Sequence, residues 1–524
     1  MVRVTIDNRP VEVPQGSTIL DAARALGIDI PTMCFMDGCA PSTSCMICVV
    51  RLGPSGKMVP ACATVVEEGM EAYNDCAEVR AARVMALELL LSDHAGDCMG
   101  PCQIGCPAKM NIPEMIRRIG AGDTEGAIGV IKDDIALPAV LGRICPAPCE
   151  KVCRRSQLDE AVSICFLKRF AADADLASGS PYKPMCAAAK GRRVAIIGAG
   201  PAGLSAAYYL SRRGYGCTVF DDGEKPGGAL RNVGQDRLPC EVLDGEVEQI
   251  MRLGVVFKTK TRIGRDESME ALCNKFDAVF AAIGKSTPET AAELGFKASG
   301  KGIAFDAATY QTDRANVFVG GDLIRNRKLA VRSVADGKEA AEAIDQYLSG
   351  ETLRGPGKAF NTRIGRLETA EVEAFRKCAS SESRQQAAET GGGFGQGAAV
   401  AEAMRCLHCD CRKGDDCKLR MYSQEYEVRA ARYKGPRRLF VQENSHPDVI
   451  YESGKCIDCG LCIQIAAAEG ERLGVTFVGR GFNVRVAAPF DKSIAEALTA
   501  AAHRCAEACP TGALALRRGA SDGG

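Results

Sequence analysis

The sequence predicts a multidomain protein that combines α/β and α+β folds. Its 524 residues are enough for roughly three to five domains. Its 27 cysteines are concentrated in runs with the short spacings of metal ligands. One glycine fingerprint, Gly198-Ala-Gly-Pro-Ala-Gly203, follows an apolar run that is typical of a buried parallel strand.

Charge and hydropathy exclude several functional classes. Lys plus Arg equals Asp plus Glu at 66 each, so no global basic field attracts nucleic acid or anionic lipid. No apolar run reaches the ~18–20 residues of a membrane span. The chain opens on a strand pattern without the apolar leader of a secreted protein. We therefore expect a cytoplasmic protein whose thiolates bind metal rather than form disulfides.

Residues 1–80 predict a small domain with one cluster. Two alternating segments, Val2–Asp7 and Pro10–Pro14, predict strands, and a helix begins at Ser17 or Thr18. Four cysteines follow with the spacing C-x10-C-x2-C-x13-C: Cys34, Cys45, Cys48 and Cys62. Such a set suits a [2Fe-2S] cluster, in which each iron takes two sulfurs. The segment resembles the ferredoxin domain at the start of the large peripheral-arm subunit of respiratory complex I, which implies a β-grasp fold.

Residues 81–187 contain two more cysteine groups on a helical pattern: Cys98, Cys102 and Cys106, then Cys145, Cys149 and Cys153. The region resembles the N-terminal helical domain of the glutamate synthase small subunit and of dihydropyrimidine dehydrogenase, which holds two [4Fe-4S] clusters. The resemblance implies that Cys98, Cys102 and Cys153 bind one cluster. It implies that the other is bound by Cys106, Cys145 and Cys149.

The fourth ligands of these two clusters depart from the family pattern. The first group lacks a cysteine, and His94 stands four residues before Cys98, as in the His-x3-Cys ligation of complex I. We expect His94 to be a ligand that raises the potential of its cluster, with an ordinary surface or cap histidine as the alternative. Cys165 is either the fourth ligand of the second cluster or a buried core cysteine, and the sequence leaves both open.

Residues 188–350 predict a Rossmann-like domain. The fingerprint glycines permit a tight turn and bring backbone close to a pyrophosphate at a helix N-terminus. Asp221 ends the next strand with a carboxylate suited to a ribose diol. With Pro226–Arg231 and Asn316–Asp322, the region resembles the FAD domain of the same glutamate synthase-type family, and an NAD-binding Rossmann domain is the alternative. The resemblance implies cofactor contacts from Gly198, Gly200, Ala202, Gly203, Asp221, Gly228, Leu230, Arg231, Gly321, Asp322, Ala330 and Val331.

Members of that family insert a complete NAD(P)H domain between the two halves of the FAD domain. Here Phe276–Gly284 matches the end of the first half, and Gly302–Asp306 already belongs to the second. The gap cannot hold a further domain of ~100 residues. We therefore expect electrons to enter from another subunit.

Residues 351–400 predict a linker that includes the glycine-rich segment 389–397. A cysteine-rich motif follows at 401–435, with the spacing C-x2-C-x-C-x5-C: Cys406, Cys409, Cys411 and Cys417. This motif suits either a [4Fe-4S] cluster or a tetrahedral structural zinc.

Residues 436–519 resemble a bacterial-type ferredoxin and again the ferredoxin-like part of the complex I large subunit. The resemblance implies one [4Fe-4S] cluster on Cys456, Cys459, Cys462 and Cys509. A second cluster is expected to be lost, because Ala466, Thr499 and Ala502 replace its cysteines and leave Cys505 as an orphan thiol.

Together these patterns predict an electron-transferring subunit with FAD, one [2Fe-2S] cluster and three or four [4Fe-4S] clusters, with zinc as the alternative at Cys406–Cys417. We expect a catalytic dehydrogenase or reductase subunit as a partner, and a ferredoxin or an NAD(P)-reducing subunit as electron donor or acceptor. Two alternatives remain, a self-sufficient or flavin-bifurcating NAD(P)H:acceptor oxidoreductase and a cluster-bearing assembly scaffold. The sequence selects no catalytic residue.

Overall fold

The computed structural model describes residues 1–285, 287–299, 302–324, 329–387 and 392–517. The chain divides into two compact units, each built from segments distant in sequence. Unit 1 consists of Met1–Gly100, Ala359–Cys378 and His408–Gly524, and unit 2 consists of Pro101–Lys358 and Ala379–Leu407. Each unit has its own buried apolar cores.

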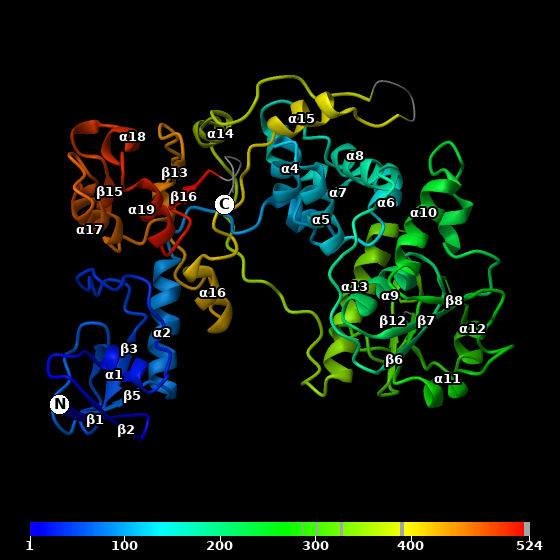
Figure 1. Cartoon of the computed structure of the whole chain (residues 1–524), viewed down its shortest axis with the longest axis horizontal. Coiled ribbons are helices and arrows are strands. Elements are labelled where there is room, and N and C mark those ends of the chain that lie inside the picture. Colours follow the sequence, from blue (N-terminus) through cyan, green and yellow to red (C-terminus); the bar gives the residue numbers. More distant parts are fainter. Residues whose placement is uncertain (286, 300–301, 325–328, 388–391, 518–524) are drawn as a thin grey trace. The chain divides into compact units, whose positions relative to one another are not determined.

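A five-stranded mixed sheet forms the first domain of unit 1, drawn in blue in Figure 1. Its strands run in the order β2-β1-β5-β3-β4, with β1 antiparallel to β2 and parallel to β5. Thr18 and Asp21 form a capping box at the start of α1, whose buried side chains pack against the sheet. This confirms the predicted β-grasp fold. Its elements are β1 (Val2–Ile6), β2 (Arg9–Val13), α1 (Ile19–Ala25), β3 (Val49–Leu52), β4 (Met58–Pro60) and β5 (Glu71–Tyr73).

The last segment of unit 1 contains two helices, α17 and α19, that pack against each other, and α19 also packs against the antiparallel pair β13–β16. This agrees with the predicted ferredoxin-like domain. The remaining elements of unit 1 are α2 (Ala77–Leu90), α14 (Thr369–Arg376), α16 (Lys418–Glu425), β13 (Val449–Tyr451), α17 (Leu461–Ala468), β14 (Thr476–Val478), β15 (Arg485–Ala487), α18 (Ile494–Ala497), α19 (Ala502–Ala508) and β16 (Leu514–Leu516).

Unit 2 begins with a group of short helices. Asn111 and Asp123 cap α4 and α5 by accepting backbone hydrogen bonds, and prolines stand in the first turns of α4, α6 and α7. Their apolar faces join α15 in one core. The helices are α3 (Pro101–Gly105), α4 (Ile112–Gly120), α5 (Thr124–Asp134), α6 (Pro138–Ile144), α7 (Pro148–Lys151), α8 (Ile164–Ala177) and α15 (Gln396–Met404).

A parallel five-stranded sheet forms the rest of unit 2, with the order β12-β9-β6-β7-β8. Helices α9 and α13 pack closely because Gly337 of α13 has no side chain. A Cβ there would lie 2.2 Å from the carbonyl oxygen of Ala202 on α9. This confirms the predicted Rossmann-like fold. The main elements are β6 (Arg193–Ile197), α9 (Pro201–Arg212), β7 (Gly216–Phe220), α10 (Cys240–Met251), β8 (Val256–Lys258), α11 (Met269–Lys275), β9 (Ala278–Ala281), β12 (Val317–Val319) and α13 (Ala330–Leu348).

Only short elements connect β9 to β12 in the described part of this stretch. They are α12 (Pro288–Glu293), β10 (Ala298–Ser299) and β11 (Gly302–Ile303). Across the described residues, no helix combines the length and the apolar character that crossing a membrane requires.

The segment predicted as a linker, 351–400, contains helix α14 and most of α15. Glu371 of α14 is 2% exposed and is held by Arg437 and by the Phe440 N–H, which donates at 2.7 Å. These partners lie more than sixty residues away in the sequence. The local pattern of polar residues and glycines therefore did not predict this helix. Residues 388–391 of the predicted linker lie outside the described residues.

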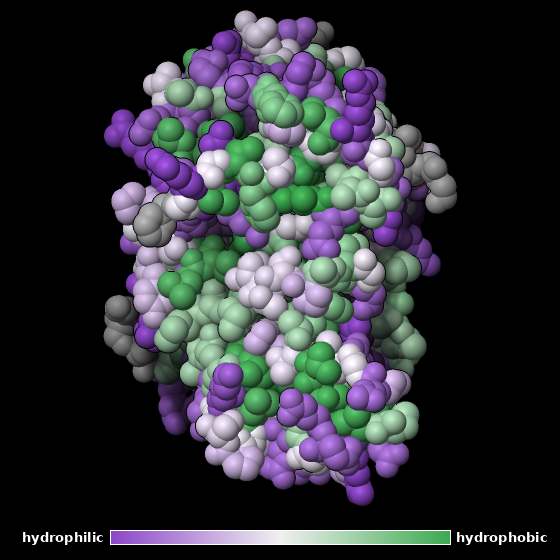
Figure 2. Space-filling model, turned by 90° about the vertical axis from the view of Figure 1, so that its left-hand side faces the viewer, coloured by the Kyte–Doolittle hydropathy of each residue, from purple (hydrophilic) through white to green (hydrophobic). Residues whose placement is uncertain are grey.

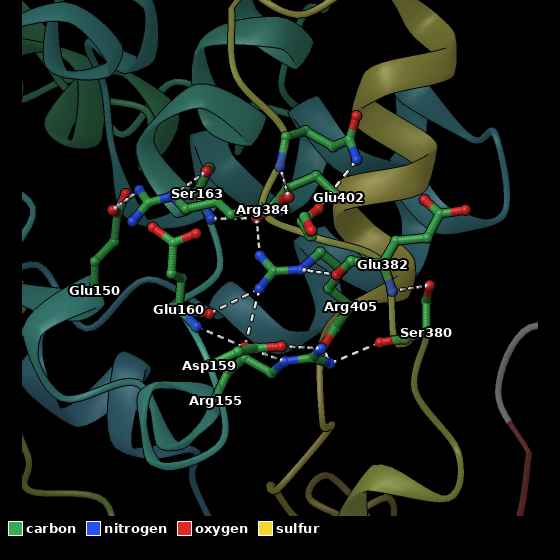
Figure 3. Close-up of polar contacts among 12 residues, drawn as sticks. Glu150, Arg155, Asp159, Glu160, Ser163, Ser380, Glu382, Arg384, Glu402 and Arg405 are labelled. Carbon is green, nitrogen blue, oxygen red and sulfur yellow. Dashed lines mark hydrogen bonds and ion pairs between the residues drawn. The ribbon is translucent and has the colours of Figure 1, made fainter.

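Two buried arginines fasten residues 379–407 to the helices of unit 2 (Figure 3). Arg155 donates to both carboxylate oxygens of Asp159, at 2.7 and 2.6 Å, and to the carbonyls of Ser380 and Arg405. Arg405 in turn donates to Glu402 at 2.8 Å and to Asp159 at 3.1 Å. Because Cys153 and Cys406 lie beside these arginines in sequence, the network also fixes the backbone that carries both thiols.

We expect the variant Arg405→Met to destabilise unit 2 strongly. It leaves the Glu402 carboxylate, which is 0% exposed, without its cation. Losing one partner of a buried pair costs about 3–5 kcal/mol. Anaerobic guanidinium unfolding of the full chain, followed by circular dichroism, should show an earlier transition.

The matched control is Arg252→Met, which breaks an ion pair with Glu248 whose side chains are 54% and 60% exposed. Its effect should stay below about 1 kcal/mol. Equal unfolding curves for the two variants would contradict the stabilising role of the buried network.

Candidate functional site

A cavity of about 1010 Å³ opens in unit 2 where β6, β7 and β9 end. Most of the residues predicted to contact the nucleotide line it: Gly198, Gly200, Ala202, Asp221, Gly228, Leu230, Arg231, Gly321, Asp322 and Ala330. Gly203 and Val331, which the sequence also predicted, are not among its lining residues. The structure therefore brings the two distant halves of the predicted nucleotide domain to one site.

The fingerprint glycines have different roles in this cavity. Gly198 has φ of +102°, and a Cβ there would lie 2.4 Å from the Ala282 carbonyl oxygen. A Cβ on Gly203 would lie 1.8 Å from the Gly198 carbonyl oxygen, so Gly203 lets α9 pack against the turn. A Cβ on Gly200 meets nothing within 4 Å, because this glycine faces open space. This is the cradle that a pyrophosphate at a helix N-terminus requires.

Two charged residues of the cavity are held by the protein itself. Asp221 accepts hydrogen bonds from the N–H groups of Ala199, at 2.5 Å, and of Gly223, at 2.8 Å. This holds the carboxylate at the end of β7. The guanidinium of Arg231 donates to the Pro226 carbonyl and pairs with Asp244 at 2.5 Å. Arg231 therefore braces the cavity wall.

The four cysteines predicted for the [2Fe-2S] cluster are all buried and meet as two pairs. Cys48 and Cys62 have their sulfurs 3.4 Å apart. The hydrogen bond from Cys45 lowers the pKa of Cys34 to about 5, and the one from Cys62 lowers the pKa of Cys48 to about 7. Two pairs of sulfurs match the pattern of two thiolates on each of two irons.

A second group of predicted ligands lies in unit 1. Two of its residues precede unit 2 in the sequence, and two follow it. His94, Cys98, Cys411 and Cys417 line one cavity. The Cys411 N–H donates to the Cys98 carbonyl at 3.4 Å, and the Thr362 hydroxyl lies 3.4 Å from the Cys98 sulfur. Burial, together with the charge of Lys455, lowers the pKa of His94 to about 3. The imidazole is therefore neutral, the form that binds metal.

A third group lies in the ferredoxin-like domain. Cys456, Cys459, Cys462 and Cys509, the four cysteines predicted to share one cluster, line one apolar cavity of unit 1. Lys413 donates to the carbonyls of Ala506, Glu507 and Cys509 at 3.1, 3.0 and 2.9 Å, which fixes the end of α19. Cys505 is fully buried beside them, and its thiol donates to the Cys462 carbonyl at 3.6 Å.

Unit 2 carries the remaining predicted ligands except Cys409, which belongs to unit 1. Cys102, Cys106 and Cys149 are buried in its main core, and Cys145, Cys153 and Cys406 pack against that core. Cys165 lies on α8 with its thiol near those of Cys145 and Cys149. Among the described residues, no three His, Cys, Asp or Glu side chains are arranged to hold a single metal ion. A cluster differs from a single ion, because its ligands surround several irons.

Three sequence families match segments of the chain. The family of 2Fe-2S iron–sulfur cluster binding domains matches residues 1–75. The 4Fe-4S cluster family described as dihydropyrimidine dehydrogenase domain II matches residues 90–180. The family of NAD(P)-binding Rossmann-like domains matches residues 196–248. The chain therefore contains both kinds of iron–sulfur domain and a Rossmann-like domain.

The curated relatives are redox enzymes. The NADP(+)-dependent formate dehydrogenase subunit beta of Moorella thermoacetica is 42% identical over 206 residues, covering 35% of this chain and 29% of that protein. The NAD-dependent dihydropyrimidine dehydrogenase subunit PreT of Escherichia coli K12 is 36% identical over 207 residues, covering 38% of this chain and 50% of that protein. The chain is therefore similar to subunits of redox enzymes over part of its length. It spans half or less of the length of these two relatives.

A solved structure also aligns with the chain. The NAD+-reducing [NiFe]-hydrogenase in its H2-reduced state matches 100% of this chain and 90% of its own at 12% identity. Its TM-score of 0.36 is too low to establish a common fold.

Two of the predicted ligand sets are divided between the two units of the chain. Cys98 belongs to unit 1, whereas Cys102 and Cys153 belong to unit 2. Cys406 belongs to unit 2, whereas Cys409, Cys411 and Cys417 belong to unit 1. The sequence concealed this division because the residues on its two sides are close in the chain, Cys98 with Cys102 and Cys406 with Cys409. The available signal was the position of Cys98, which stands just before unit 2 begins, and of Cys411, just after it ends.

We expect Cys45→Ser to remove the [2Fe-2S] centre of the first domain. The variant takes one thiolate from the Cys34–Cys45 pair, so about two irons per chain should be lost with the corresponding EPR signal. Iron analysis and EPR of the dithionite-reduced full chain measure both effects. Cys39→Ser is the matched control on the same loop and should keep both. An unchanged spectrum for Cys45→Ser would exclude this ligand set.

Proposed function

We propose that the chain is an electron-transferring iron–sulfur flavoprotein subunit that relays electrons between a catalytic partner subunit and an acceptor. One observation carries the proposal. Ile144 lines the nucleotide cavity, and the next residue, Cys145, belongs to a cysteine group. A flavin in that cavity therefore borders a cluster. Flavins exchange two electrons with one partner and single electrons with clusters.

FAD is the cofactor that we assign to the cavity. Its volume of about 1010 Å³ is at the upper end of the ~300–1,000 Å³ of small-ligand sites, as an extended dinucleotide requires. The fingerprint strand supplies one end. Gly321, which lies shortly after β12, and Ala330, which begins α13, supply the other. An NAD(P)-binding domain in this place would leave the clusters without a converter between two-electron and one-electron steps.

We assign one [2Fe-2S] and four [4Fe-4S] clusters. The [2Fe-2S] cluster takes Cys34, Cys45, Cys48 and Cys62. One [4Fe-4S] cluster takes His94, Cys98, Cys411 and Cys417, because these line one cavity, which leaves no four-cysteine zinc set at Cys406–Cys417. The ferredoxin-like domain holds a second one on Cys456, Cys459, Cys462 and Cys509. Unit 2 holds the other two, on Cys106, Cys145 and Cys149 and on Cys102, Cys153 and Cys406.

A partner subunit follows from the organisation of the chain. The relatives are named as subunits of a formate dehydrogenase and of a dihydropyrimidine dehydrogenase, and this chain has no separate NAD(P)H domain between β9 and β12. Unit 1 exposes large apolar side chains, among them Met46, Phe477 and Phe490. Figure 2 shows hydrophobic patches among hydrophilic residues on one face. Such patches are typical of protein interaction sites.

A self-sufficient NAD(P)H oxidoreductase is the second candidate, because residues 196–248 match a family described as NAD(P)-binding. Anaerobic mixing of the purified chain with NADH or NADPH separates the two. We expect no rapid bleaching of the flavin absorbance without a partner, while dithionite reduces flavin and clusters. Rapid bleaching by either nucleotide alone would favour the second candidate.

We expect Gly200→Val to abolish flavin binding while leaving the fold intact. Gly200 has extended backbone, with φ of −77° and ψ of −175°, and a Cβ added there meets no atom within 4 Å outside the neighbouring residues. A valine there therefore extends into the cradle. Flavin released by heat denaturation should fall at least tenfold per chain. Gly357→Val, another position with nothing within 4 Å, is the control and should retain the flavin.

We expect His94→Cys to keep the iron content and lower the potential of one cluster by on the order of 100 mV, since a thiolate is more negative than a neutral imidazole. His94→Ala should lose about four irons per chain. Spectroelectrochemical titration followed by EPR measures the shift. The control is His503→Cys, because the native His503 side chain is 61% exposed, and it should leave every potential unchanged. If His94→Ala retains all its iron, His94 is not a ligand.

A further inference from the structure

Four cysteines of unit 2 come together where α6, α7, α8 and the end of α3 meet. Helices α6 and α8 touch through backbone, because a Cβ on Gly142 would lie 2.7 Å from the Arg169 Cβ and 2.8 Å from its Cα. Arg143 also donates to both carboxylate oxygens of Asp173, at 2.7 and 2.9 Å. Cys145, which follows α6, is thereby placed against α8, and Cys165 lies in the first turn of that helix.

Cys106 and Cys149 reach the same place through α3 and α7. A Cβ on Gly105 would lie 2.5 Å from the Val152 Cγ2, so these two short helices are in close contact. The Cys165 N–H donates to Glu150 at 2.9 Å, and the other carboxylate oxygen of Glu150 is held by Arg384 at 2.7 Å (Figure 3). The turn that carries Cys149 is thus tied to the start of α8.

The cationic side chain of Lys168 lies at this junction. It follows Cys165 by three residues on α8, so the two share a helix face. It is 4% exposed and makes no salt bridge with a carboxylate in the part of the chain that the structure describes. A buried ammonium is costly unless an opposite charge accompanies it.

We propose that Cys106, Cys145, Cys149 and Cys165 hold one [4Fe-4S] cluster and that Lys168 is its buried counter-cation. This deepens the proposed function, because it gives the cluster next to the flavin cavity its fourth ligand and a device that sets its potential. A fourth thiolate makes the cluster more negative and harder to reduce than a neutral ligand does. The ammonium offsets one unit of that charge. The cluster can then accept single electrons from a bordering flavin.

The ligand part of the proposal is tested by Cys165→Ala, with Cys217→Ala as the matched control. Cys217 is also a buried cysteine of unit 2, at 2% exposed, and lies on strand β7. In the full chain purified anaerobically, Cys165→Ala should lose at least one iron and the EPR signal of one reduced cluster. Cys217→Ala should keep the native iron content and signals. Equal iron and equal spectra in both variants would overturn the assignment.

The charge part is tested by Lys168→Met and Lys168→Arg. Lys168→Met should keep all its iron while one cluster, the one that Cys165→Ala removes, shifts to a more negative midpoint potential. Lys168→Arg should stay near the native value. If Lys168→Met leaves every midpoint unchanged at full iron content, Lys168 is not a counter-cation.

The readouts also separate this proposal from the proposed function. Iron content, EPR signals and midpoint potentials do not require flavin or a partner. A chain that lacks FAD but shows these shifts would contradict the proposed function and support the ligand set. A chain that binds FAD but does not show these shifts would support the proposed function and contradict the ligand set.

Discussion

The rest of this structure depends on one constraint: negatively charged thiolates in its interior need positive charge nearby. A thiolate in an apolar interior is unfavourable unless a metal or a cation offsets it. In unit 1, Lys455 is 2% exposed, pairs with Glu452 and acts on both Cys411 and His94. In unit 2, Lys168 is 4% exposed and lies one helical turn after Cys165 on α8. With aromatic residues at 5% of the chain and no tryptophan, large apolar side chains are scarce. Metal centres are a recognised way for small domains to gain stability.

One backbone hydrogen bond joins the two parts of unit 1 that lie before and after unit 2 in the chain. The Cys411 N–H and the Cys98 carbonyl are 3.4 Å apart, although unit 2 lies between them in the chain. Domains accept insertions where the two ends of the inserted chain are close together and at a surface. Here the point of insertion is also the site of a proposed cluster. The same contact that closes unit 1 brings Cys98 together with Cys411 and Cys417.

The sequence predicted those features that depend on short-range pattern. The Gly198–Gly203 fingerprint, the capping at Thr18 and the spacing from Cys456 to Cys462 correspond to a Rossmann turn, a capped helix and a shared cavity. It did not predict features that depend on tertiary contact. Helix α14 relies on Arg437, and the partners of His94 come from beyond an inserted unit. Cys165 stayed undecided, because only the crossing of α6 and α8 at Gly142 places it beside Cys145.

The interleaved order of the two units has a consequence for how the protein is made. The β-grasp domain draws its strands, its helix and its four cysteines from the first 73 residues, so it can fold soon after synthesis begins. Unit 2 requires residues up to Leu407. The His94 group requires Cys417, and the ferredoxin-like cavity requires Cys509 near the end of the chain. Until those residues are made, thiols such as Cys98 and Cys456 lack the other members of their groups. We therefore expect oxygen to damage these thiols most during synthesis, before the chain is complete.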